Sequence, residues 1–200
     1  MILQALLATF PYDVTGPEPG PDSALVAGVL AGDGESVALF VRRYHGLVFG
    51  IAYRMTGDAS LSEDLSQEVF LRALAALPKF DAARPLLPWI RSIAARHVLN
   101  FVTRSPRRRE TALESSPVAL GLLEPGHDPH ERLEAKERER SVRRALLLLP
   151  EKQRLVITLK YGGDLTTEEI SDILEVPRNT VKTWLLRARE ILRKELTRAV

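Results

Sequence analysis

The sequence contains no cysteine and only four histidines among its 200 residues. Disulfides, thiolate zinc sites and a cysteine nucleophile are therefore excluded, which is typical of a reducing compartment. The only close histidine pair, "HDPH" at 127–130, is interrupted by proline and has no third nitrogen or thiolate ligand nearby. No glycine-rich phosphate loop or nucleophile motif is present. We therefore expect no metal, no cofactor, no small-molecule substrate and no enzymatic activity.

Long hydrophobic runs are also missing. The apolar start "MILQALLATF" lacks a basic flank and runs directly into "PYDVTGPEPGPDS". It is too short to span a bilayer and does not have the pattern of a signal peptide. We expect residues 1–21 to form a disordered leader and the protein to be cytoplasmic.

No alternating strand pattern occurs, and apolar residues instead recur at three- and four-residue steps. In 36–57 they form one stripe that ends at Gly57, a residue favoured just after helices. In a second helix, 61–77, Leu65, Val69, Ala73 and Leu77 should face inward, and Ser60 and Glu63 have the spacing of a capping box. A loop at 80–88 then leads to a helix that starts near Trp89. Residues 22–104 are predicted to form a compact helical bundle.

The composition changes after residue 104. Residues 105–129 hold four prolines and no sustained periodicity, and they turn acidic after Arg109. This predicts a flexible linker over 105–140, followed by a second helical domain over 141–200. The expected fold is therefore all-α, with two small domains, a helical bundle and a helix-turn-helix. Cleavage within 110–125 should release two separately folded fragments.

The C-terminal stretch "TTEEISDILEVPRNTVKTWLLRAREILRKEL" has the pattern of a helix-turn-helix. Thr166 or Thr167 should cap the first helix, and Asn179 or Thr180 the second. The buried stripe of the second helix is predicted to be Val181, Leu185, Ala188 and Leu192. Its outer face is basic, as suits the major groove of DNA, where Arg and Lys pair with guanine edges and phosphates. The turn departs from the usual motif because Glu175 stands where glycine is common.

With these motifs in order, the chain resembles the extracytoplasmic-function (ECF, group IV) sigma factors of bacterial RNA polymerase. The likeness covers 22–104 and 141–198. It rests on "AGDGESVALFVRRYHGLVFGIAYRMTGD", "SEDLSQEVFLRALAAL", "PWIRSIAARHVLN" and "LLLLPEKQRLVITLKYGGDLTTEEISDILEVPRNTVKTWLLRAREILRKEL". Many relatives carry asparagine where this chain has Arg96.

The resemblance implies three sets of contact residues. The first set would bind the clamp helices of the largest polymerase subunit and consists of Asp64, Leu65, Gln67, Glu68 and Phe70. Within this set, Leu65 and Phe70 mainly pack behind the contact. Reading and opening of the −10 element falls on Phe80, Asp81, Trp89, Arg91, Arg96 and Asn100, with Trp89 expected to serve mostly as core. Recognition of the −35 element falls on Lys160, Thr167, Arg178, Asn179, Lys182, Thr183, Leu186 and Arg187.

The implied partners are core RNA polymerase, at its clamp helices and flap region, promoter DNA, and an anti-sigma factor that is often membrane-anchored. A stand-alone dimeric helix-turn-helix regulator is the alternative. It shares the C-terminal pattern and would bind a two-fold operator by itself. It leaves "EDLSQEVF" and "PWIRSIAARHVLN" without a role.

Overall fold

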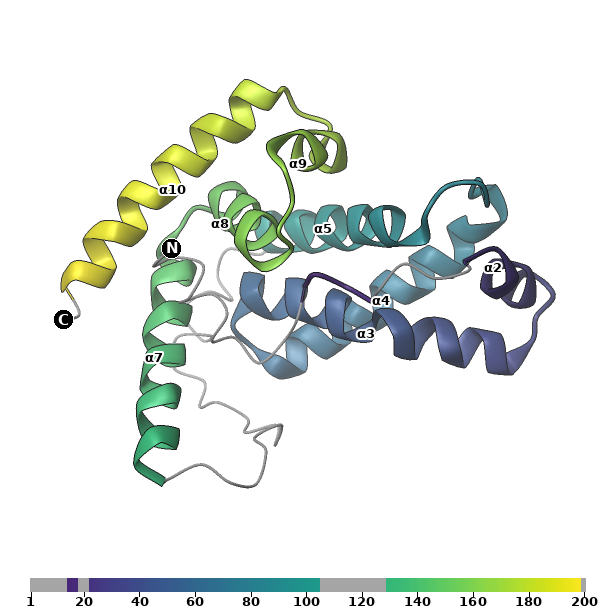
Figure 1. Ribbon diagram of the computed structural model, residues 1–200, viewed down its shortest axis with the longest axis horizontal. Coiled ribbons are helices and arrows are strands. Elements are labelled where there is room, and N and C mark those ends of the chain that lie inside the picture. Colours follow the sequence, from purple (N-terminus) through teal and green to yellow (C-terminus); the bar gives the residue numbers. More distant parts are fainter. Residues whose placement is uncertain (1–13, 18–21, 105–128, 199–200) are drawn as a thin grey trace.

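The computed structural model describes residues 14–17, 22–104 and 129–198, and within these ranges the chain is helical with no strand (Figure 1). The all-α fold class is confirmed. The N-terminal domain consists of α2 (Asp22–Leu30), α3 (Gly34–Thr56), α4 (Ala59–Ala76), the short η1 (Leu77–Lys79) and α5 (Leu86–Arg104). The C-terminal domain consists of α7 (Pro129–Leu148), α8 (Glu151–Ile157), the π-helical turn η2 (Thr158–Gly162), α9 (Thr167–Leu174) and α10 (Arg178–Arg198).

The predicted apolar stripes are confirmed. The whole stripe of α10 is buried, and so are Leu65, Val69 and Ala73 of α4 and Leu77 of η1. The apolar stripe of α3 is also buried and consists of Phe40, Tyr44, Leu47, Val48, Ile51 and Met55. Gly57 ends α3 with φ 73°, in the left-handed region that a residue without Cβ adopts at low cost.

The start of α4 differs from the prediction. The capping residue is Asp58, whose Oδ1 accepts a hydrogen bond from the Leu61 N–H at 3.0 Å. The expected capping box of Ser60 and Glu63 is therefore wrong, because the helix begins before it. The Glu63 carboxylate is instead turned toward α3, where it lies 3.2 Å from His45 Nε2.

The start of α5 also lies earlier than predicted. The helix begins at Leu86 because a distant carboxylate serves its first turn: Asp22 Oδ2 accepts from the Leu86 N–H at 2.9 Å. Three residues expected in the 80–88 loop, Leu86 to Pro88, are thus helical. Such a cap, from a residue 64 positions away, leaves no trace in the local pattern.

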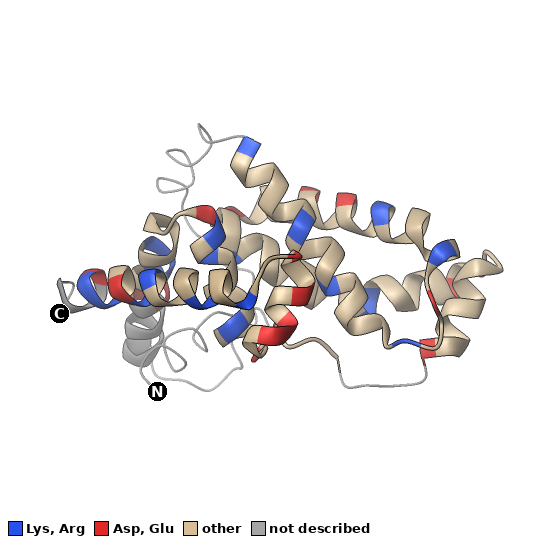
Figure 2. Cartoon of the chain, turned by 90° about the horizontal axis from the view of Figure 1, so that it is seen from above, with Lys and Arg blue, Asp and Glu red and all other residues tan. Residues whose placement is uncertain are grey.

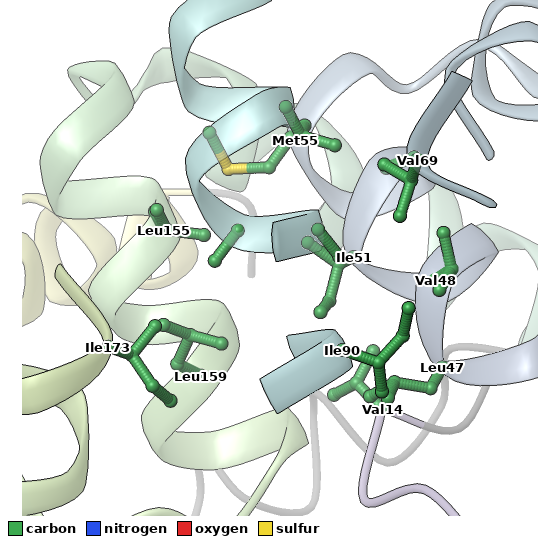
Figure 3. Packing of buried hydrophobic residues seen from close by; sticks show 14 of the residues in the cluster. Val14, Leu47, Val48, Ile51, Met55, Val69, Ile90, Leu155, Leu159 and Ile173 are labelled. Atoms are coloured by element: carbon green, nitrogen blue, oxygen red, sulfur yellow. The ribbon is translucent and has the colours of Figure 1, made fainter. Parts of the chain in front are cut away.

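The two domains share one hydrophobic cluster. Figure 3 shows Leu155, Leu159 and Ile173 of the C-terminal domain facing Ile51 and Ile90 of the N-terminal domain. Close approach to the Gly162 backbone supports this packing: a Cβ on Gly162 would overlap Arg54 Nη1 and lie 2.5 Å from Val14 Cγ2. The domains therefore pack against each other in this conformation, whereas the sequence led us to expect separate folding units.

Buried arginines supply the polar part of this interface. Arg154, 1% exposed, donates through Nη1 to the Met55 carbonyl at the end of α3. Its Nη2 donates to the carbonyls of Leu147 and Leu149, each at 2.9 Å. These acceptors lie at the C-terminal ends of α3 and α7, where helix carbonyls lack intrahelical partners. One guanidinium thus caps helices of both domains.

The predicted leader and linker lie mostly outside the described residues. Residues 1–13, 18–21 and 105–128 are not described. Within the leader, however, Val14 is 1% exposed and packs in the core. At the other boundary, α7 starts at Pro129, inside the stretch predicted as linker, and continues into the predicted C-terminal domain. None of the helices in the described ranges combines the length and apolarity needed to cross a membrane.

Candidate functional site

An exposed polar edge runs along α4. Asp64, Gln67 and Glu68 are exposed, while Leu65 and Phe70 are buried beneath them at 1% and 6%. Spacings of three and four residues place the three polar side chains on one helical face. The edge is thus positioned by the same stripe that anchors α4 in the core.

Glu68 is the one member of this edge with a tertiary ion-pair partner among the described residues. Its Oε2 lies 2.9 Å from Nε2 of His97 on α5. Burial and the nearby Arg72 lower the pKa of His97, while Glu68 opposes this shift. The three residues line a groove of about 450 Å³ together with Asn100, Phe101 and Arg104. The groove brings Glu68 of the docking set next to Asn100 of the −10 set. The sequence shows Glu68 and Arg72 one turn apart, but not their approach to His97.

Phe80, Asp81 and Trp89 come together where η1 leads into α5. The rings of Phe80 and Trp89 lie 4.8 Å apart with a 47° tilt, and both are half-buried against the core. Asp81 Oδ1 accepts from the Ala83 N–H at 3.0 Å, and Asp81 also pairs with Arg84 at 3.4 Å. The loop thus presents an aromatic pair beside an exposed carboxylate.

Arg91 does not belong to this surface. It is 4% exposed, and its Nη2 donates to the carbonyls of Val14 and Thr15. In this conformation its side chain is turned into the core, away from the surface that carries Phe80 and Asp81. The reason is geometric: at about 100° per residue, position 91 lies about 200° around the helix from Trp89. Trp89, Arg96 and Asn100, spaced at seven and four residues, share one side of α5.

The helix-turn-helix forms as predicted, with one exception. Thr166 caps α9 in a full capping box with Glu169, and this hydrogen bonding lowers the pKa of the Glu169 carboxyl. The second helix starts at Arg178, and the Pro177 carbonyl accepts from the Thr180 N–H at 2.8 Å. Asn179 and Thr180 therefore lie inside its first turn, and the prediction that either caps it is wrong.

The outer face of α10 carries the predicted −35 residues. Arg178, Asn179, Lys182, Thr183, Leu186 and Arg187 are all exposed, with Leu186 at 58%. Figure 2 shows basic residues recurring along this helix, which leads to the C terminus. Three of the set have internal partners: Arg178 pairs with Glu168, Thr183 Oγ1 donates to the Asn179 carbonyl, and the half-buried Lys160 donates to the Leu165 carbonyl. Thr167 opens α9, half-buried.

Comparison with known proteins identifies both domains. The Sigma-70 region 2 family matches residues 40–108, and the Sigma-70 region 4 family matches residues 139–192. The ECF RNA polymerase sigma factor SigW of Bacillus subtilis (strain 168) is 32% identical over 178 residues, covering 84% of this chain and 92% of SigW. The chain belongs to the ECF sigma factors of RNA polymerase.

Two solved structures share the fold. The structure of CnrH in complex with the cytosolic domain of CnrY matches with a TM-score of 0.62 at 22% identity, over 90% of this chain and 100% of that one. The sigma factor RpoE in complex with the anti-sigma factor NepR from Bartonella quintana matches with a TM-score of 0.60 at 19% identity, over 80% and 96%. Sigma factors act in transcription initiation with RNA polymerase. The match to region 2 also disfavours the stand-alone regulator, which gives the N-terminal domain no such role.

Proposed function

We propose that this ECF sigma factor docks on core RNA polymerase through the α4 edge formed by Asp64, Gln67 and Glu68. The observation that carries the proposal is the exposure of this acidic edge above a fully packed stripe. The family resemblance implies a basic partner, the clamp helices of the largest polymerase subunit. Complementary charge orients such a complex and speeds its formation. The flap region of the polymerase is the partner proposed for the C-terminal domain.

The −10 element is read by the N-terminal domain. Opening a duplex requires a pocket for an unstacked base and cations for the backbone. Phe80, Trp89 and Asp81 supply an aromatic wall with an adjacent polar group. Arg96 and Asn100, on the same side of α5 as Trp89, are the further polar contacts.

The −35 element is read by α10. Its exposed face presents Lys182, Thr183, Leu186 and Arg187 to the major groove, where side chains of these types contact base edges. Arg178 and Asn179 in its first turn contact phosphates or adjacent bases, together with Lys160 of η2 and Thr167 of α9. Each domain alone binds its DNA element weakly. Polymerase holds the two domains at a fixed separation, so that their DNA contacts act together.

The sigma factor itself catalyses no reaction and works in the cytoplasm. An anti-sigma factor is its proposed inhibitor, by analogy with the RpoE–NepR complex. Where such a partner is membrane-anchored, it would hold the chain at the membrane.

The docking proposal is tested by reversing the charge of the edge. Asp64→Arg combined with Glu68→Arg should abolish binding to core polymerase in a pull-down, because both side chains would then oppose a basic surface. Glu35→Arg, an exposed acid in the first turn of α3, is the matched control and should bind normally. Circular dichroism should show the same helix content in all three proteins. Unchanged polymerase affinity of the double variant would refute the assignment.

A further inference from the structure

A charged contact joins the two domains at the turn of the helix-turn-helix. Arg96, on α5, donates through Nε to the carbonyl of Ile173 at 2.8 Å. Its Nη2 lies 2.9 Å from Glu175 Oε1. Both acceptors are within the last turn and cap of α9, so one guanidinium group contacts two residues of one short segment of the other domain. Planar guanidinium groups favour such two-point contacts.

Glu175 occupies a backbone position that disfavours any side chain with a Cβ. Its φ of 53° and ψ of 44° are left-handed, a conformation that glycine adopts without steric cost. The side chain is 71% exposed and so gains little from burial. Its ion pair with Arg96 is the contact that it makes across the domain boundary. Glu175 departs from the usual helix-turn-helix motif, Arg96 stands where many relatives carry asparagine, and in the fold the two residues are partners.

The closed arrangement is incompatible with simultaneous reading of both promoter elements, a step that rests on the proposed function. The −10 and −35 elements lie about 25 base pairs apart, which at about 3.4 Å per base pair is about 85 Å of B-form DNA. Here Arg96, of the −10 set, touches Glu175. The first residue of the recognition helix, Arg178, is three positions later and thus within about 11 Å of Glu175. The domains must separate before both elements can be bound.

We propose that the Arg96–Glu175 contact is an interdomain latch that biases the free chain toward this closed form. The shared apolar cluster provides most of the closing free energy, and the latch adds a charge-dependent part. Because both side chains are partly exposed, salt screens the pair. Exposed ion pairs are worth roughly a two- to fivefold change in an equilibrium constant. The latch occupies Arg96 while the chain is closed and frees it for DNA when polymerase holds the domains apart.

The test measures the distance between domains in the free, full-length protein. The chain has no cysteine, so Leu30→Cys on α2 and Glu190→Cys on α10, both exposed, provide the only labelling sites for single-molecule energy transfer. Glu175→Gln, which removes the charge, should raise the ratio of open to closed molecules about two- to fivefold at low salt. The difference should vanish at about 1 M salt, where the screening length is about 3 Å. Asp172→Asn, an exposed acid on the same helix, is the matched control and should leave the ratio unchanged.

Glu175→Gly separates the latch from a purely local role. Glycine relieves the left-handed backbone, so it should stabilise the turn while still increasing the open fraction. An open fraction that is unchanged in both Glu175 variants at low salt, or that falls in Glu175→Gly, would overturn the proposal. The measurement needs neither polymerase nor DNA. Failure of the latch is therefore distinct from failure of polymerase docking, which the charge reversal on α4 tests.

Discussion

Replacing Arg154 by methionine should destabilise the protein strongly, because this guanidinium serves three backbone carbonyls in a dry site. The residue is 1% exposed, and its acceptors belong to Met55, Leu147 and Leu149. Methionine keeps most of the apolar stem but donates no hydrogen bond. Met55 and Leu149 are fully buried, so water does not readily replace the lost donors.

The magnitude follows from these contacts. A buried polar group left without its partner costs about 1–3 kcal/mol. Three carbonyls lose a donor, and the positive charge at two helix C-termini is lost as well. Removal of the buried charge returns part of this cost, because its desolvation penalty disappears with it. We expect a net loss of about 3–5 kcal/mol, a large part of the stability of a domain of ordinary size.

Urea unfolding followed by circular dichroism measures this loss. Arg144→Met, an exposed arginine on α7, is the control and should change the free energy of unfolding by less than about 0.5 kcal/mol. Arg154→Lys should fall between the two variants, because an ammonium group keeps the charge but not the planar fork. A loss below about 1 kcal/mol in Arg154→Met would refute the reasoning, since it would mean that water reaches these carbonyls.

Three further predictions concern DNA reading, pH and domain association. Arg187→Ala should cost about 1–3 kcal/mol at the −35 element in holoenzyme binding assays, and an equal loss on all DNA sequences would reduce its role to a phosphate contact. Because the pKa of His97 is lowered on folding, the unfolded chain binds the proton more readily, so stability should fall as the pH drops from about 7.5 to about 5.5. His97→Gln should flatten that urea-midpoint profile, and an equally steep profile in the variant would contradict the assignment. Co-expressed chains 1–109 and 126–200 should elute as one complex in size-exclusion chromatography because of the shared cluster, and separate elution would support independent domains.

Local patterns predicted α3, α4 and α10 and their inner faces, but not the choice between nearby caps. Thr166 was one of two candidates for the α9 cap, and in the structure it caps the helix, with Glu169 completing a capping box. For α4 the pattern favoured Ser60, whereas Asp58 caps the helix. The deciding contacts are partly tertiary: the Ser62 hydroxyl donates to the Asp58 carbonyl and is 2.9 Å from Thr56 Oγ1 on α3.

In the candidate site, too, local patterns predicted some features, whereas others depend on tertiary contacts. Exposure of the α10 face followed from helical periodicity, whereas the outward α4 edge was implied by the family resemblance. The burial of Arg91 could also have been predicted from the sequence, because Arg91 lies about 200° around the helix from Trp89. The interdomain roles of Arg96 and Arg154 were not, because a charged residue in a helix is normally solvated and only the packing of a distant segment changes that.

The distribution of these arginine contacts suits an interface that must open. Arg154 holds two carbonyls of its own domain and one of the other, so separation breaks only the bond to Met55. Arg96 is 43% exposed already, so its release into water or onto DNA carries a small desolvation change. Neither arginine is left buried without an acceptor when the domains part. Opening therefore costs apolar contact area together with the buried hydrogen bond from Arg143 to the Tyr53 hydroxyl. A polymerase surface that offers new contacts to both domains can recover that cost.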